Sequence, residues 1–182
     1  MTEKLTATGY ALNRITEHER FSVSPGGGHT VESFVGWIER GAFFYDADYQ
    51  REYVWKKKQQ QEFLHTLISG FPLGTVAIAK RPEWLSVNGP WMEVVDGKQR
   101  LMTLEKLING EIPIILKGRE LWWHQMTRGE HLAFGRPFLP MVTLNNATKE
   151  SILDYFIAVN FTGVPQSTKH KAKVLAMREE LK

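Results

Sequence analysis

Apolar residues recur at helical spacing in several stretches of the chain. After Thr30, apolar side chains stand at positions i, i+3, i+4 and i+7 before Gly41. This pattern predicts an amphipathic helix with a threonine cap and a glycine stop. The same spacing predicts four further helices, over residues 57–69, over 98–108, from 146 or 148 to 159, and from Ser167 to the end of the sequence.

Shorter apolar runs between these helices predict strands. Residues 75–79 and 91–95 are expected to form two buried strands that pair with each other. Residues 112–116 predict another strand, with a proline that suits an edge. Aromatic and β-branched residues between Phe43 and Trp55 predict a strand or an extended edge. Together these elements favour an α+β fold, in which helices surround a small mixed sheet.

Two stretches show no clear periodicity. Residues 1–29 are polar and end in Ser-Pro-Gly-Gly-Gly-His, which predicts a flexible N-terminal segment. Residues 131–140 mix aromatic residues with glycine and proline, so we expect an irregular section there. The predicted organisation is a flexible segment over residues 1–29 and a single domain over residues 30–182.

Composition narrows the class of protein. A chain of 182 residues that is 42% hydrophobic is long enough for one well-packed domain. Cysteine is absent, which excludes disulfides and thiolate metal sites. The net charge of +3 is mild for a dedicated nucleic-acid binder. No apolar run approaches the roughly 20 residues of a membrane span, and no signal peptide is evident, so we expect a cytoplasmic protein without membrane contact.

The most informative motif follows the strand at residues 91–95. Asp96 and Gly97 break this strand directly into a helix whose first turn carries Lys98, Gln99 and Arg100. A helix N-terminus has unpaired N–H groups and a partial positive charge, so it favours a bound anion. Two cations at such an end are unfavourable unless an anion offsets them. The motif therefore indicates a phosphate site, with a simple turn capped by Asp96 as the alternative interpretation.

A second polar cluster lies in the segment at residues 49–55. Gln50, Arg51 and Glu52 stand there between aromatic and β-branched residues. Polar side chains in such a segment are expected to serve a purpose beyond solvation. No nucleophile elbow, P-loop or His-x-x-x-His zinc helix occurs in the sequence, so the common hydrolase and P-loop mechanisms are not supported.

Together the two segments resemble the N-terminal domain of GmrSD-type restriction systems, a branch of the ParB/sulfiredoxin-like superfamily. The first resembles that family's Tyr-Gln-Arg-x-Tyr-x-Trp signature, and the second its Asp-Gly-Gln-Gln-Arg-x-x-Thr-Leu signature, with Lys98 where the family usually carries glutamine. A weaker third match is the helix end from Phe156 to Asn160, where Ala158 replaces an arginine of many relatives. The matching residues of the first two segments are Tyr49, Gln50, Arg51, Tyr53, Trp55, Asp96, Gly97, Gln99, Arg100, Thr103 and Leu104.

The resemblance implies a stand-alone nucleotide-binding domain of a modification-dependent restriction system for phage defence. The implied ligand is a nucleoside triphosphate, and whether it is hydrolysed is left open. Asp96 and Arg100 are the candidate catalytic residues. Asp96 would orient the turn, bind Mg²⁺ or accept a proton from water, and it is the one candidate metal ligand. The candidate phosphate-binding residues are Gln50, Arg51, Gly97, Lys98, Gln99 and Asn160.

Two other functions remain open at this level. The mild basicity and the lysine-rich helix starts suit a DNA-binding or nicking protein of ParB-like type. A non-catalytic interaction protein of phage or mobile-element origin, which binds a restriction-system nuclease subunit, is the other alternative. Nucleotide preference and oligomeric state are not encoded in any recognisable motif.

Overall fold

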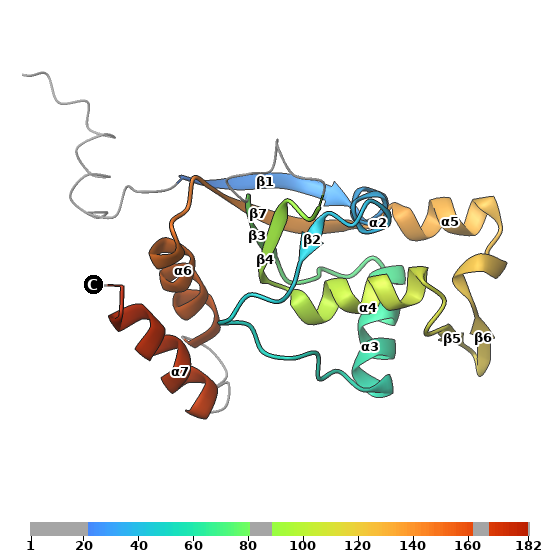
Figure 1. The fold of residues 1–182 in the computed structure, drawn as a ribbon. Helices are drawn as coiled ribbons and strands as arrows, with labels where there is room; N and C mark the ends of the chain where they lie inside the picture. Colours follow the sequence, from blue (N-terminus) through green and yellow to red (C-terminus); the bar gives the residue numbers. More distant parts are fainter. Residues whose placement is uncertain (1–21, 81–88, 162–167, 182) are drawn as a thin grey trace, which may run out of the picture.

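A mixed five-stranded sheet forms the centre of the molecule (Figure 1). The computed structural model describes residues 22–80, 89–161 and 168–181. The strand order is β1-β7-β3-β4-β2, and a separate hairpin pairs β5 with β6. The strands of the sheet are β1 (Ser22–Thr30), β2 (Phe43–Phe44), β3 (Val76–Lys80), β4 (Met92–Asp96) and β7 (Phe138–Asn145), and the hairpin consists of β5 (Ile114–Leu116) and β6 (Arg119–Leu121).

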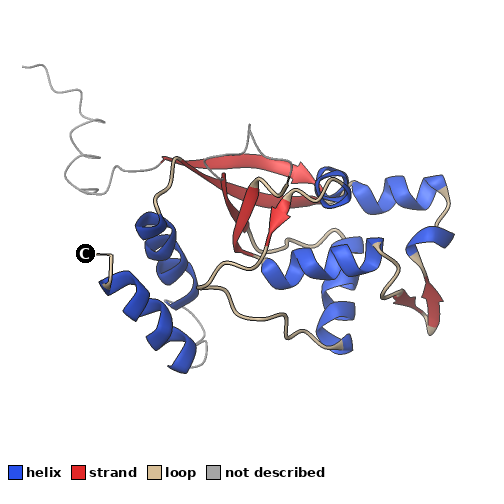
Figure 2. Cartoon of the chain, viewed as in Figure 1, coloured by secondary structure: helices blue, strands red, loops and turns tan. Residues whose placement is uncertain are grey.

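Helices cover both faces of this sheet (Figure 2). The alternation of side chains along β3 shows why, because Val76 and Ile78 join one hydrophobic cluster and Ala77 and Ala79 join the other. The first face packs against α2 (Val31–Glu39), α3 (Lys57–Ile68), α4 (Lys98–Ile108) and α5 (Arg128–Gly135). The second packs against α6 (Lys149–Phe161) and α7 (Thr168–Glu179).

The register of β3 and β4 fixes where α4 begins. The two strands are antiparallel, and Asp96 at the end of β4 lies opposite Ala77 near the start of β3. The chain therefore enters α4 beside Gly74 and Thr75, the residues that lead into β3. This placement brings the start of α4 next to backbone carbonyl groups of a neighbouring strand entry.

Most of the predicted elements are confirmed. The structure is α+β, as expected, and α4 has the predicted bounds. α2, α3, α6 and α7 lie close to their predicted ranges, and β3 and β4 pair as predicted. Within the described residues, no helix has the length and apolar character to cross a bilayer.

The loop predicted at the glycine run is wrong for the residues that the structure describes. Ser22–Thr30 forms β1, which pairs antiparallel with β7 and has an irregularity between Gly26 and His29. β1 is an edge strand, where Pro25 can be accommodated because one side of the strand needs no partner. Glycines at a bulge explain the rest of the unusual composition. Residues 1–21 lie outside the described part of the chain.

The irregular section predicted at residues 131–140 is also wrong. It contains the larger part of α5 and the start of β7, a strand that lies between β1 and β3. Pro140 can occur inside the sheet because neither neighbour needs its missing N–H. The β1 ladder is irregular at this level, and pairing with β3 starts only at Met141.

The segment at residues 49–55 is not a strand. Only Phe43 and Phe44 form β2, and residues 51–56 have no regular secondary structure. Backbone groups of this segment bond to side chains instead of to a neighbouring strand. The side chains responsible belong to the candidate site.

Candidate functional site

The turn between β4 and α4 requires a glycine and leaves the helix start without a side-chain cap. Gly97 has a φ of +96°, and a Cβ atom there would lie 3.0 Å from the Val76 side chain. Gly97 is the N-cap residue, and no side chain caps it within the described chain, so Asp96 is not the cap that the alternative interpretation assigned to it. An uncapped helix start of this kind favours anions.

A pocket of about 140 Å³ opens at this turn, and we call it the α4 pocket. Three segments that are distant in sequence line it, namely the loop after β2, the start of α4 and the end of α6. The structure brings all of the predicted site residues together here, along with Trp55 and Phe156. Those predicted residues are Gln50, Arg51, Asp96, Gly97, Lys98, Gln99, Arg100 and Asn160.

The size of the pocket limits what it can enclose. Sites for complete small-molecule ligands usually measure about 300 to 1,000 Å³. The α4 pocket, at about 140 Å³, suits a phosphate-sized group rather than a whole nucleotide. Any larger ligand must extend beyond it.

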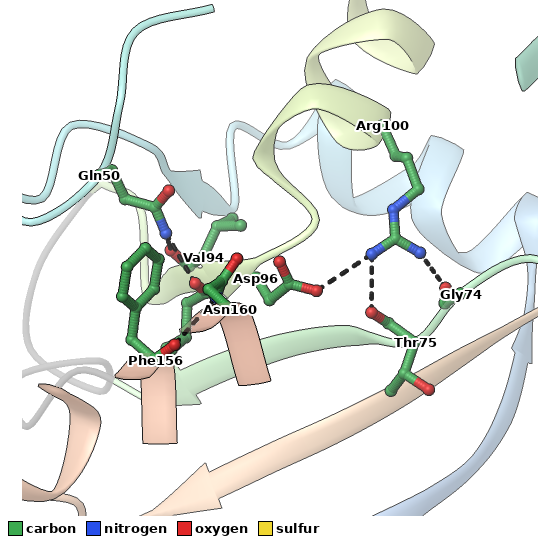
Figure 3. A network of polar contacts seen from close by, with 9 residues as sticks. Gln50, Gly74, Thr75, Val94, Asp96, Arg100, Phe156 and Asn160 are labelled. Carbon is green, nitrogen blue, oxygen red and sulfur yellow. Dashed lines mark hydrogen bonds and ion pairs between the residues drawn. The ribbon is translucent and has the colours of Figure 1, made fainter. Parts of the chain in front are cut away.

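Gln50 attaches the loop after β2 to the end of β4. Its Nε2 donates hydrogen bonds to the carbonyl oxygens of Val94 and Val95, at 2.9 and 2.7 Å (Figure 3). The neighbouring Tyr49 hydroxyl donates to Glu93 Oε1 at 2.7 Å, and burial raises the pKa of Tyr49, with a further increase from Glu93. The amide donor of Gln50 is thus engaged by the backbone, which makes this residue a structural link as well as a lining residue.

Gln99 holds the same loop from the side of α4. Its Oε1 accepts hydrogen bonds from the N–H groups of Val54 and Trp55, at 2.9 and 3.2 Å, and its Nε2 donates to the Glu52 carbonyl oxygen at 3.0 Å. The side chain is buried. Three backbone groups of a segment without secondary structure are satisfied in this way.

Residues that sequence reasoning left without a role complete this link. The Tyr53 and Thr103 hydroxyls lie 3.0 Å apart, and Gln60 Nε2 donates to the Tyr53 hydroxyl at 2.9 Å. Thr103 also donates to the Gln99 carbonyl oxygen. Tyr53 belongs to the first signature and Thr103 to the second. Their places in these two signatures were the signal in the sequence that the two segments contact each other.

Arg100 is held by three acceptors at the back of the turn (Figure 3). Its guanidinium donates to the Gly74 carbonyl oxygen, to the Thr75 carbonyl oxygen at 2.8 Å, and to Asp96 Oδ2 at 3.2 Å. Burial lowers the pKa of Arg100, and Asp96 opposes that shift. Three of its five N–H donors are thus engaged within the described part of the chain. Arg100 therefore fixes the turn and Asp96 in place before any ligand binds.

Lys98 is a buried cation beside the uncapped helix start. Its side chain is 6% exposed, and its ammonium lies 3.5 Å from Asp46 Oδ1, whose own side chain is 84% exposed. That distance is at the outer limit of a hydrogen bond. Lys98 lines the α4 pocket, and among the described residues it has only this weak counterion.

The remaining predicted residues differ in how firmly they are held. Arg51 is exposed at the edge of the pocket. Asp96 is 27% exposed and is oriented by its ion pair with Arg100. Asn160 Nδ2 donates to the Phe156 carbonyl oxygen at 3.1 Å within α6 (Figure 3). Burial raises the pKa of Tyr155 in α6, and the Asp96 charge raises it further.

The pocket lining carries a positive balance of charge. Arg51, Lys98 and Arg100 are opposed within the lining by Asp96 alone. Among the described residues, no three histidine, aspartate or glutamate side chains are grouped to hold a metal ion. Chemically, the arrangement can bind an oxyanion through backbone N–H groups and cations, and it can present one fixed carboxylate to it.

Comparison with known proteins identifies the family. A family model described as GmrSD restriction endonuclease, N-terminal domain, matches residues 31–134. No curated protein and no solved structure matches the chain. The matched range contains both signature segments and most of the lining of the α4 pocket, and it spans more than half of the 182 residues. The chain therefore belongs to the family of GmrSD restriction endonuclease N-terminal domains.

Proposed function

We propose that the α4 pocket binds a phosphate group of a nucleoside triphosphate. The observation that supports this most strongly is the convergence of three distant segments on one uncapped helix start. An uncapped end beside a buried lysine is costly for the fold, because unpaired N–H groups and a cation both disfavour that position. A bound anion offsets both costs.

The proposed roles follow from how each side chain is held. The backbone N–H groups at the start of α4 and the Lys98 ammonium bind phosphate oxygens. Arg51, which is exposed at the edge, binds a phosphate oxygen from the opposite side. Gln50 and Gln99 keep the loop after β2 in position. Asn160 closes the pocket from α6.

Hydrolysis is the finer part of the proposal and depends on Asp96. Its orientation by Arg100 suits a carboxylate that positions an attacking water or accepts a proton from it. Mg²⁺ is usually held by one or two carboxylates together with substrate phosphates, so the single carboxylate of Asp96 fits such an ion only when a phosphate is present. The ion would neutralise charge on the phosphates.

Isothermal titration calorimetry with ATP, GTP, CTP and UTP, with and without Mg²⁺, tests the proposal. Arg51→Ala is the informative variant, because the residue is exposed and its removal leaves the core intact. Arg119→Ala in β6 is the matched control, since Arg119 is also exposed and does not line the pocket. We expect Arg51→Ala to weaken binding about tenfold and Arg119→Ala to leave it unchanged.

Phosphate release measured with Asp96→Asn then tests hydrolysis. We expect this variant to keep binding and to lose turnover. Absence of heat with all four nucleotides would overturn the proposed binding. Duplex DNA binding that weakens steeply with salt would then favour the DNA-binding alternative, and co-purification with a restriction-system nuclease subunit would favour the interaction protein.

A further inference from the structure

The environment of Lys98 is unusual for a charged side chain. The residue is 5% exposed, and its ammonium carries three N–H donors. Among the described residues, its one recorded partner is Asp46, with 3.5 Å between the two charged atoms. A buried ammonium normally has close hydrogen-bonding partners, because losing hydration is costly. Among the described residues, the Lys98 ammonium therefore has unused bonding capacity, and the residue lines the α4 pocket.

Asp46, the partner of Lys98, is exposed rather than buried. Its side chain is 84% exposed, and the described chain records no partner for it other than Lys98. It follows β2 in a stretch without regular structure, and it does not line the pocket. An exposed carboxylate of this kind gives up an ion pair at little cost, because water can replace the lost contact.

We propose that Asp46 acts as an internal stand-in for the ligand. In the absence of an anion it neutralises Lys98, and an incoming phosphate displaces it and takes over the ammonium. Asp46 would then set the affinity of the site by competition, and its release would signal occupancy to the loop after β2. This inference rests on the proposed function, since it describes how that same pocket exchanges one anion for another.

The chain offers a matched control two residues away. Asp48 is also an exposed carboxylate, at 55% side-chain exposure, and it pairs with Lys149 at 2.6 Å instead of with Lys98. Asp48 does not line the α4 pocket. Asp46→Asn and Asp48→Asn therefore remove the same charge from the same loop, but only the first removes the competitor of Lys98.

The experiment measures dissociation constants for ATP and for inorganic phosphate by calorimetry in the full chain. The variants are Asp46→Asn, Asp46→Glu, Asp48→Asn, Lys98→Gln and the double variant Asp46→Asn with Lys98→Gln. We expect Asp46→Asn to tighten binding by about twofold to fivefold, the range that corresponds to removing one competing ion pair. Asp46→Glu should remain near wild type, and Asp48→Asn should change affinity by less than about twofold because of screening.

The double variant separates competition from a simple field effect. Removing a nearby negative charge would favour any anion even without Lys98. Displacement from Lys98 instead requires that Asp46→Asn has no effect once Lys98 is glutamine. Equal gains in the two backgrounds, or equal gains from Asp46→Asn and Asp48→Asn, would overturn the inference and leave the proposed function standing.

Failure of the proposed function gives a different result. In that case neither ATP nor inorganic phosphate binds the wild type or Asp46→Asn, and both proposals fall together. Thermal denaturation of each variant provides a second measurement that does not rely on Lys98→Gln. Phosphate should raise the melting temperature of Asp46→Asn more than that of Asp48→Asn, since the freed ammonium of Lys98 gains a partner only in the first. Equal increases would contradict the exchange.

Discussion

The N-termini of α4 and α5 differ in whether a side chain caps their unpaired backbone N–H groups. At α5, Thr127 Oγ1 accepts a hydrogen bond from the Glu130 N–H, and the Glu130 carboxylate accepts one from the Thr127 N–H at 2.7 Å. This capping box satisfies the helix end locally. At α4, Gly97 provides no side chain, and the following turn contains Lys98 and Arg100 but no acidic residue.

The difference teaches what each helix start is suited for. A capped end is worth about 1 kcal/mol to the fold. α2 also has no side-chain cap, but N–H groups at the starts of α2 and α6 have acceptors. The first N–H of α2 donates to the Pro137 carbonyl oxygen, and Thr148 accepts from Ser151 at the start of α6. α4 lacks such a side-chain cap while its start lines a pocket. Its stability must come from elsewhere, which makes the two helix starts respond differently to substitution.

The largest contrast is expected for the glycine in each start. Gly97→Ala should destabilise the protein by about 3 kcal/mol, because alanine is strained at positive φ and its Cβ would meet Val76 at 3.0 Å. Gly129→Ala in the first turn of α5 is the control, since its Cβ would lie 4.0 Å from the nearest atom, Thr127 Oγ1. We expect a gain of about 0.5 kcal/mol there. Urea denaturation measures both, and similar losses at the two sites would break the comparison.

The second contrast concerns the side chain of α4 that holds the loop after β2. Gln99→Ala should cost about 2 kcal/mol, because it leaves the N–H groups of Val54 and Trp55 without their acceptor. Gln125→Ala, at an exposed position, serves as the control and should be close to neutral. Hydrogen exchange should show the loss as faster exchange in residues 52–55. A stable loop in Gln99→Ala would mean that the signature glutamine does not hold it.

A smaller effect is expected from the cap of α5. Thr127→Ala should destabilise the protein by about 1 kcal/mol, since it removes the acceptor for the Glu130 N–H. Nucleotide binding should be unaffected, because Thr127 does not line the α4 pocket. Denaturation and calorimetry on the same variant check both statements. A change in nucleotide affinity would show that the two helix starts are coupled.

The parts of the fold that could be predicted depend on local patterns. Five helices, namely α2, α3, α4, α6 and α7, followed from apolar spacing, and the bounds of α4 were marked by Gly97 and by the Asn109-Gly110 pair. β1 and β7 were missed because their ladder is non-local. Whether Pro25 and Pro140 are compatible with strands depends on which neighbour bonds at that level, and this information is not contained in either segment.

The candidate site was also predicted only in part: its local turn was predicted, and the contacts between distant segments were not. The motif Asp96–Arg100 predicted the turn, because a glycine between a strand and a helix permits the positive φ that a tight turn needs. The residues that line the α4 pocket were named from the two signatures, yet the bonds from Gln50 and Gln99 to backbone groups were not foreseen. Nothing in the sequence marked Asp46 as a site residue, since its contact with Lys98 joins residues 52 positions apart.

Acid should produce the smallest and most local difference between the two helix starts. Hydrogen bonds from the backbone and hydroxyl of Thr127 hold the pKa of Glu130 below its ordinary value. A carboxyl whose pKa is lower in the folded state stabilises the fold above its unfolded pKa of about 4.3, and this contribution is lost as the pH falls through the folded value. The amide signals of Thr127 and Glu130 in an NMR titration should therefore move together in that acidic range. Glu130→Gln should abolish this movement and leave the amide signals of residues 98–100 unaltered, because the carboxylates that pair with that turn are Asp46 and Asp96 and not Glu130. A persistent transition at α5 in Glu130→Gln would assign the pH response to another group.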